Sequence, residues 1–539
     1  MTMFRRDLLK FAPGGVLAAM YGGAVIPQAF GKSANPERWV GGPGFVSVKD
    51  FGAKGDGSTI DTNAINMAIE TVSKSGGGTV RIPAGTYKSF SIHLKSSVVL
   101  YLEQGATVVA ADTPAERTTN GYDTAEENRE GGTFQDFGHS HWHNSLIWGE
   151  NLHDIAIVGP GKIWGKGLTS ALSHQPRAES PGAGNKALAL KNCLNVVLRD
   201  FSILQGGHFG ILATGLDNLT IDNLKVDTNR DGIDIDCCRN VRVSNCYVNS
   251  PYDDGICLKS SYALGYPRST ENVTITNCYV TGFYEVGTML DGSYKKLVPD
   301  AHESPTGRIK CGTESNGGFK SITISNCIFD NCRGFALESV DGAALEDIVF
   351  SGITMQNVRQ SPLFLRLGSR MRGPEGMPVG TFKRIKISDV ISNNAVSKFA
   401  GIISGVPGHP VEDVTISNVY LHHQGGGTDE MAAIVPPEEE RRYPEPDMFG
   451  PMSAHGFFVR HAKNIEFRNV EFAAANRDQR PVLWAMDVDG LGLINMKIPA
   501  AQGPLVADLR NIDALFLSGS RNMKDMRSDH VAELKVERS

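Results

Sequence analysis

Three aspartates occur in two consecutive copies of one short repeat. The segment Asp231–Ile233, "DGI", returns 23 residues later (254 − 231 = 23) as Asp254–Ile256, and Asp253 precedes the second copy. Carboxyl groups held close together cannot all ionise cheaply, so one should keep a proton near neutral pH. A protonated carboxyl beside ionised ones is what cleavage of a glycosidic bond needs. The pattern indicates a hydrolytic site; the alternative is a set of Asp turns, an aspartate ladder or a calcium site.

Two cations are expected close to these aspartates. If the two copies are neighbouring rungs of a coil, equivalent residues lie about 4.8 Å apart. Asp231 then stacks on Asp254, and Asp236 stacks on Lys259. Threading the next two segments, 307–312 and 333–338, places Arg308 and Lys310 one rung beyond the aspartates and Glu338 in the column of Asp236 and Lys259.

The element that must position these residues is a repeated strand. The phrase "NVRVSNCYV" from Asn240 recurs as "NVTITNCYV" from Asn272 and "SITISNCIF" from Ser321. Looser copies begin at Asn195, Asn218, Asp347, Arg384, Asp413 and Asn464. Each copy alternates apolar and polar residues, and the closest copies begin 22 residues apart (240 − 218 = 22). Such rungs bury their apolar faces only on one another, which predicts an all-β, right-handed, single-stranded parallel β-helix.

One amphipathic helix is expected near the N-terminus, within residues 58–78. Ile65, Ala68 and Ile69 suit its buried face, and Asp61 suits its N-cap. The helix would cover the end of the coil, where open strand edges would otherwise aggregate. We expect the cap and first strands in residues 32–104 and the catalytic β-helix, with loop insertions, in residues 105–539.

At the aspartates the chain resembles glycoside hydrolase family 28, the polygalacturonases and rhamnogalacturonan hydrolases. The family's Asn-Thr-Asp motif is matched by Asn229–Asp231 and its Asp-Asp motif by Asp253-Asp254, while "VKDFGAKGDGSTIDTNAINMAIE" resembles the opening of pectin-degrading β-helix proteins. The resemblance covers roughly residues 45–475. It implies inverting hydrolysis of a galacturonate-containing, pectin-type polysaccharide without a cofactor. Asp253 would be the general acid, and Asp231 and Asp254 would hold the attacking water.

Two departures from the family concern the substrate. The Gly-His-Gly motif should fall where Thr306-Gly307-Arg308 stand, and the Arg-Ile-Lys motif matches Arg308–Lys310 although rung count gives its place to Ala336–Glu338. Either an insertion disguises the register, or the cations have moved one rung and Glu338 faces the sugar. Arg308 and Lys310 then bind a uronate carboxylate or neutralise the aspartates. The expected substrate-binding residues are Asn229, Arg308, Lys310, Lys259, Glu338 and His208.

Weaker signals lie outside these rungs. His139, His141 and His143 alternate in "GHSHWHN", so on one strand they would share a face; with Trp142 they are expected to line the cleft, and a metal site is the alternative. His208 is either a cleft residue or a buried histidine. The charged, proline-rich segment Val435–Asp447 is expected to be a solvated loop.

Composition and the first residues bear on location. The 539 residues carry a net charge of −6, which argues against a nucleic-acid protein. Residues 1–31 resemble a twin-arginine export signal, with an ordinary secretory signal as the alternative, so we expect a bacterial periplasmic or extracellular protein that is not inserted in a membrane. Nine cysteines are present; Cys246, Cys278 and Cys327 share one repeat position, which predicts a buried column of free thiols.

Two rival functions remain open. A polysaccharide lyase on the same scaffold would use calcium and an Arg or Lys base. A non-catalytic β-helix would bind or adhere to carbohydrate without cleaving it.

Overall fold

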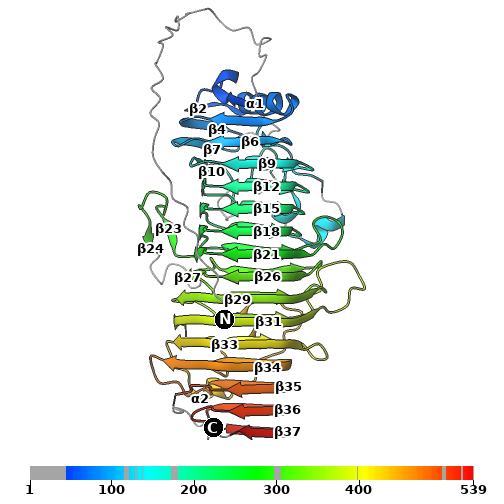
Figure 1. The fold of residues 1–539 in the computed structure, drawn as a ribbon, viewed down its shortest axis with the longest axis vertical. Coiled ribbons are helices and arrows are strands. Elements are labelled where there is room, and N and C mark those ends of the chain that lie inside the picture. The colour runs from blue at the N-terminus through cyan, green and yellow to red at the C-terminus, as the bar shows by residue number, and fades with distance from the viewer. Residues whose placement is uncertain are drawn as a thin grey trace, which may run out of the picture. The chain divides into compact units, whose positions relative to one another are not determined.

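The computed structural model describes residues 44–114, 120–127, 130–135, 137–170, 180–296, 305–396, 398–499, 505–523 and 526–537. The predicted export signal, residues 1–31, lies outside them. Residues 43–539 form one compact unit in which successive strands stack along a single coil (Figure 1). None of the described helices is long and apolar enough to cross a membrane.

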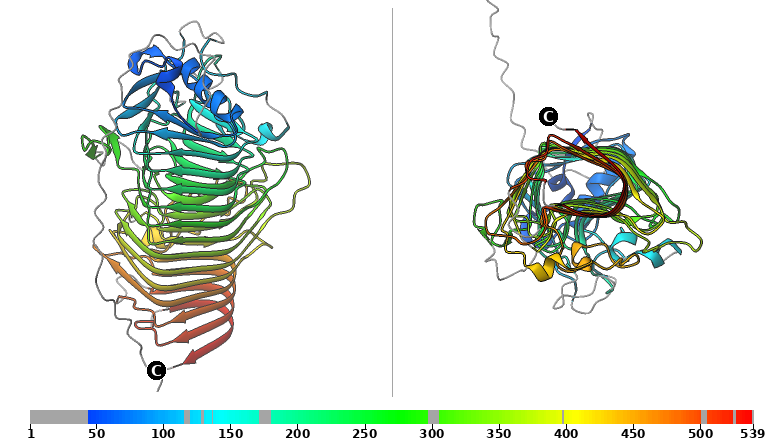
Figure 2. Two further views of the ribbon diagram at one scale, coloured as in Figure 1. Left: turned by 45° about the horizontal axis from the view of Figure 1, so that its top comes forward. Right: turned by 90° about the horizontal axis from the view of Figure 1, so that it is seen from below.

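Three parallel sheets run along this coil, and seen end-on their strands superpose (Figure 2). The repeated phrases form the first, which we call the repeat sheet. Its strands, in order of pairing, are β1 (Phe45–Ser47), β3 (Gly78–Ile82), β6 (Val98–Leu102), β9 (His153–Val158), β12 (Leu194–Arg199), β15 (Asp217–Asp222), β18 (Arg239–Ser244), β21 (Thr270–Thr276), β26 (Phe319–Ser325), β29 (Ala344–Gln356), β31 (Thr381–Ala395), β33 (Val411–His423), β34 (Phe457–Ala474), β35 (Leu483–Ile494), β36 (Ala507–Ser518) and β37 (Met526–Glu537).

The second sheet carries the predicted catalytic residues, and we call it the site sheet. It consists of β5 (Ile92–His93), β8 (Ile147–Glu150), β11 (Lys186–Lys191), β14 (Phe209–Thr214), β17 (Asp231–Asp236), β20 (Ile256–Ser260), β25 (Ile309–Ser315), β28 (Phe335–Ser339), β30 (Leu363–Leu367) and β32 (Gly401–Ser404), which pairs with β34. The third sheet consists of β2 (Asp56–Ile60), β4 (Gly85–Ser89), β7 (Ala106–Ala110), β10 (Lys162–Trp164), β13 (Ser202–Leu204), β16 (Lys225–Asp227), β19 (Tyr247–Asn249), β22 (Tyr279–Thr281) and β27 (Ile328–Asp330), which pairs with β29. A small hairpin, β23 (Tyr284–Val286) and β24 (Lys295–Lys296), stands apart.

The repeat register is the predicted one. Val241 pairs with Val273, which pairs with Ile322, and all three are buried in the core. The Asn or Asp at the start of most copies has a reason in backbone geometry, because these positions have positive φ, for example 56° at Asn240 and 57° at Asn272. Asn and Asp tolerate this left-handed conformation better than most side chains.

The N-terminal helix is confirmed as α1 (Thr62–Lys74), and Ile65, Ala68 and Ile69 are buried as predicted. Asp61 stands at its N-cap without a capping hydrogen bond. Its carboxylate instead accepts hydrogen bonds from the backbone N–H groups of Lys54 and Gly55, at 2.7 and 2.9 Å. Asp61 therefore fixes the preceding loop. Strand pairing continues across residue 104, since β7 pairs with both β4 and β10.

Two insertions cover the outward face of the site sheet. We call the described parts of residues 120–145 the histidine insertion; it contains η2 (Glu130–Phe134) and η3 (Phe137–Ser140). Residues 424–456 are the proline insertion, with α2 (Asp429–Ala432) and η4 (Pro446–Phe449). Their short helical segments, cyan and yellow-orange in Figure 2, lie on the same side of the coil.

Candidate active site

The strands of the site sheet stack the predicted catalytic rungs in the predicted register. Ile233 pairs with Ile256, which pairs with Ile309, and Asp236 pairs with Lys259. Lys310 lies between Cys257 and Ala336. The literal Arg-Ile-Lys match therefore stands on the rung directly after Asp253-Asp254, in the register that the threading predicts.

The three aspartates are brought together. One carboxylate oxygen each from Asp231, Asp253 and Asp254 lies within 4.8 Å of the others. Asp231 and Asp254 are 2% and 1% exposed, whereas the Asp253 side chain is 27% exposed. The cluster thus has two buried members and one that solvent reaches.

Asp254 is the ionised member. Lys310 Nζ lies 2.5 Å from its Oδ2, and Arg308 Nε donates to its Oδ1 at 3.0 Å. Burial alone would raise the pKa of Asp254, but the two cations outweigh burial and hold the pKa well below its usual range. An ionised carboxylate of this kind can act as a base or hold a water.

Asp231 is the member that keeps a proton. Burial, then the charges of Asp234 and Asp253, raise its pKa well above the usual value. Its Oδ1 is buried and has no hydrogen-bond partner among the described residues. Asp253 pairs with Arg230, whose Nη2 lies 2.8 Å from its Oδ2. The cluster therefore combines a stored proton with a fixed anion, which is the combination that acid–base cleavage requires.

Lys259 and Asp236 are partners in the strand register, but the ion pairs of Lys259 are made with other carboxylates. Its Nζ lies 3.6 Å from Asp234 Oδ2 and 3.3 Å from Glu314 Oε2. Asp236 instead accepts hydrogen bonds from Ser261. Glu314 reaches this position because the register shifts between Cys311 and Ser315. Burial, partly offset by Lys259, raises the pKa of Asp234 to about 8.

Glu338, which one of the two alternatives has facing the sugar, is fully buried. Its Oε1 lies 3.7 Å from Arg308 Nη2, and burial raises its pKa to about 8 despite the nearby cations. Asn229 is half-buried. His208 is 8% exposed and stacks on Phe209, so it is closer to a buried histidine than to an open cleft residue.

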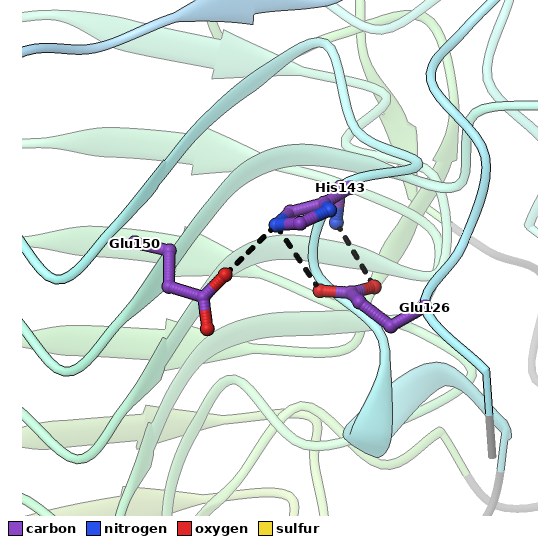
Figure 3. A group of neighbouring side chains, drawn as sticks. All are labelled: Glu126, His143 and Glu150. Atoms are coloured by element: carbon purple, nitrogen blue, oxygen red, sulfur yellow. Dashed lines mark hydrogen bonds and ion pairs between the residues drawn. The ribbon is translucent and has the colours of Figure 1, made fainter.

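The three alternate histidines do not share a strand face, because η3 and a turn replace the expected strand. His139 is buried with its Nε2 3.7 Å from Asp234 Oδ2, and burial lowers its pKa to about 3. His143 instead contacts two glutamates, Glu126 and Glu150 (Figure 3). Trp142 is buried, and its indole N–H donates to Thr214.

The segment Val435–Asp447 is a loop with many exposed side chains, as predicted, but contacts with the coil fix it in place. Glu445 lies 2.7 Å from Arg308 Nη2 and 3.0 Å from Arg333 Nη1. Two buried arginines of the coil hold its backbone: Arg460 donates to the carbonyls of Pro436 and Pro437, and Arg366 donates to that of Glu438. The insertion is therefore a fixed cover over the cations of the site.

The fold and the site together define a right-handed parallel β-helix protein with a carboxylate cluster on the outward face of one sheet. A family model described as "Right handed beta helix region" matches residues 177–297 and 209–370. A second, described as "Rhamnogalacturonase A/epimerase, pectate lyase-like", matches residues 45–144.

Individual relatives agree with these models. A probable polygalacturonase of Vitis vinifera is 24% identical over 403 residues, which are 70% of this chain and 74% of that protein. Alginate lyase 7 of Azotobacter vinelandii is 46% identical over 65 residues, 12% of this chain and 8% of that protein. The solved Yersinia enterocolitica family 28 exopolygalacturonase superposes with a TM-score of 0.60 at 19% identity, covering 85% of this chain and 78% of that one. The predicted fold and the predicted resemblance to polygalacturonases are both confirmed.

Proposed function

We propose that this chain is a glycoside hydrolase that cleaves glycosidic bonds in a pectin-type, galacturonate-containing polysaccharide. The observation that carries the proposal is the gathering of Asp231, Asp253 and Asp254, with a proton favoured on Asp231 and an anion held on Asp254. Similarity to polygalacturonases supplies the substrate class.

In this mechanism Asp253 delivers a proton to the leaving oxygen, because it is the member of the cluster that substrate can reach. Asp231, within 4.8 Å of Asp253, supplies that proton to Asp253 instead of holding the water as expected, and Asp254, as an ionised base, holds the attacking water and accepts its proton. The resemblance implies inversion, whereas oxygens this close are nearer the spacing of retaining enzymes, about 5–5.5 Å. We keep inversion, because the water need not lie on the line between the carboxyls; NMR of the first-formed product anomer tests this choice.

Arg308 and Lys310 serve mainly to neutralise the site in this proposal. Both are almost fully buried and both bind Asp254. Arg308 also meets Glu445, so its donors are largely engaged before substrate arrives. Of the two roles considered for this pair, the contacts favour fixing the charge of Asp254 over binding a uronate.

The test is release of reducing ends from a panel of pectic polysaccharides. Hydrolysis gives saturated products, whereas the rival lyase, which the short alginate lyase match and the "pectate lyase-like" family model favour, gives unsaturated ends that absorb ultraviolet light. An increase in ultraviolet absorbance during the reaction would identify the protein as a lyase and not as a hydrolase. Binding without any release of reducing ends would favour the non-catalytic alternative. We also propose that residues 1–31 direct export, which fractionation of the producing cell tests.

A further inference from the structure

A second polar cavity lies on the face of the site sheet that carries the aspartates. Its volume is about 480 Å³. β8 and β11 contribute Glu150 and Lys191, the histidine insertion contributes Glu126 and His143, and the loop after β20 contributes Leu264. The size is within the range of small-ligand sites, about 300–1,000 Å³.

The polar groups of this cavity form one connected chain. Glu126 accepts hydrogen bonds from the backbone N–H groups of Trp142 and His143 at 2.9 and 3.3 Å. His143 Nε2 lies 3.5 Å from Glu126 Oε1 and 2.9 Å from Glu150 Oε2 (Figure 3). Lys191 Nζ lies 3.0 Å from the other oxygen of Glu150.

These contacts fix the side chains but leave part of their hydrogen-bonding capacity unused. Each ionised carboxylate can accept about four hydrogen bonds and an ammonium can donate three. Glu126, Glu150 and Lys191 are all partly exposed, with 19–24% of each side chain accessible. Oriented acceptors and a donor therefore face a cavity, an arrangement suited to a ligand rich in hydroxyl groups.

The cavity is close to the aspartate cluster. Lys191 pairs with Thr214, which pairs with Asp236, so Lys191 stands two rungs, about 10 Å, from a strand of the catalytic rungs. Ser140 lines the cavity, and the preceding His139 touches Asp234. One polysaccharide chain can thus reach both places.

The charges of the lining decide which sugar fits. Glu126, Glu127 and Glu150 face one lysine and one histidine, so the carboxylates outnumber the cations and the lining is negative. A uronate carboxylate would be repelled, whereas hydroxyl groups bind carboxylates and ammonium alike. We propose that this cavity binds an uncharged sugar residue of the polysaccharide, so that the substrate is a heteropolymer of galacturonate and neutral sugar. The inference rests on the proposed function for the identity of the polymer.

The experiment uses full-length Asp253→Asn protein, which should bind without cleaving. Calorimetry compares galacturonate oligosaccharides with oligosaccharides of equal length that alternate galacturonate and a neutral sugar, both in EDTA. We expect the mixed oligosaccharide to bind at least tenfold more tightly. Adding Lys191→Met or Glu150→Gln should remove that preference. Met keeps the packing over the Trp142 ring, whose centre lies 4.1 Å from Lys191 Nζ.

Lys497→Met is the matched control, because Lys497 also pairs with a glutamate, Glu471, at 3.0 Å but on an exposed surface in the C-terminal rungs. Leu264→Trp, which fills the cavity from its loop, is a second variant should the others misfold. Equal affinity for the two oligosaccharides, or an unchanged preference in the variants, would overturn the inference, as would a preference that is absent in EDTA and appears only when the titrations are repeated with divalent metal. Wild-type cleavage of the panel of pectic polysaccharides is measured separately. If the wild type cleaves but the Asp253→Asn protein does not prefer the mixed oligosaccharide, only this inference fails. If the preference is seen but nothing is cleaved, only the proposed function fails.

Discussion

Asp253 differs from its two partners in being open to solvent, with 27% of its side chain exposed. Replacing it with Asn removes the proposed proton donor and leaves the packing almost unchanged. We expect turnover to fall by about 10²–10⁴-fold, with an unchanged melting temperature. Asp112→Asn, at a surface aspartate that is 75% exposed, should keep full activity. Activity of Asp253→Asn near that of wild type would remove Asp253 from the mechanism.

Lys310 determines the charge of Asp254. Lys310→Met removes the cation that lowers the Asp254 pKa most, so this pKa should rise. The acidic limb of the pH–rate profile should then move to higher pH on every substrate, with Lys320→Met, an exposed site, as control. If the limb stays in place while KM rises only on acidic substrates, Lys310 contacts substrate instead.

How far the site could be predicted depended on sequence distance. The aspartates were found because their offset equals one rung of the coil. Glu445 was missed because it lies 137 residues from Arg308, and no repeat connects an insertion to the strand that it covers. Glu126 was missed for the same reason, since a loop brings it to His143. Arg230 lies within the motif Asn229–Asp231, but its ion pair with Asp253 is seen only in the structure.

Among the elements, α1 covers the first rungs of the coil. Ile69 is fully buried, whereas Met67, two residues earlier, is 51% exposed. Ile69→Asp buries an unpaired charge, so α1 should detach and expose strand edges. We expect a lower melting temperature and a larger aggregated fraction by light scattering, with Met67→Asp as the matched control. If the two variants have equal melting temperatures and equal aggregated fractions, α1 does not cap the coil.

The strands were predictable and the insertions were not, for a physical reason. Strand residues alternate between core and solvent, so the apolar pattern fixes both their existence and their register. The proline insertion has no such period. The buried guanidinium groups of Arg366 and Arg460 hold the insertion by donating hydrogen bonds to its backbone carbonyls. The charged side chains in its sequence do not indicate that the backbone is the part that is bound.

At the scale of the whole molecule, stability depends on buried carboxyl groups. The pKa of Glu338 is raised from 4.5 to about 8 by burial. The folded state therefore keeps a proton that the unfolded chain loses above pH 4.5. The stability from this group is present at low pH and is lost as pH rises towards 8, by up to about 1.4 kcal/mol per pH unit.

Glu338→Gln should remove this dependence. Denaturant unfolding at pH 5 and pH 8 should show the variant gaining stability relative to wild type at the higher pH. Glu466→Gln, at a partly exposed strand position, should show no such gain. A constant difference between variant and wild type at both pH values would contradict the assignment.

The nine cysteines are all free and buried, as predicted for Cys246, Cys278 and Cys327. Burial raises the thiol pKa, to about 11 at Cys193 and about 12 at Cys238, so the reactive thiolate is scarce. A thiol-reactive dye should label almost no cysteine in the native protein and nine after denaturation. Intact disulfides by mass spectrometry would contradict this.

Because the strands of each rung pair only with those of the rung before and the rung after, the coil works as a ruler. The aspartate cluster and the second cavity are marks on it, and each rung adds about 4.8 Å between marks. Inserting or deleting one rung between β11 and β17 would change the distance between the cluster and the cavity by about 4.8 Å. The residues within each of the two sites would stay the same. A lineage built on this coil can therefore alter the spacing of sugars that it reads without redesigning either site.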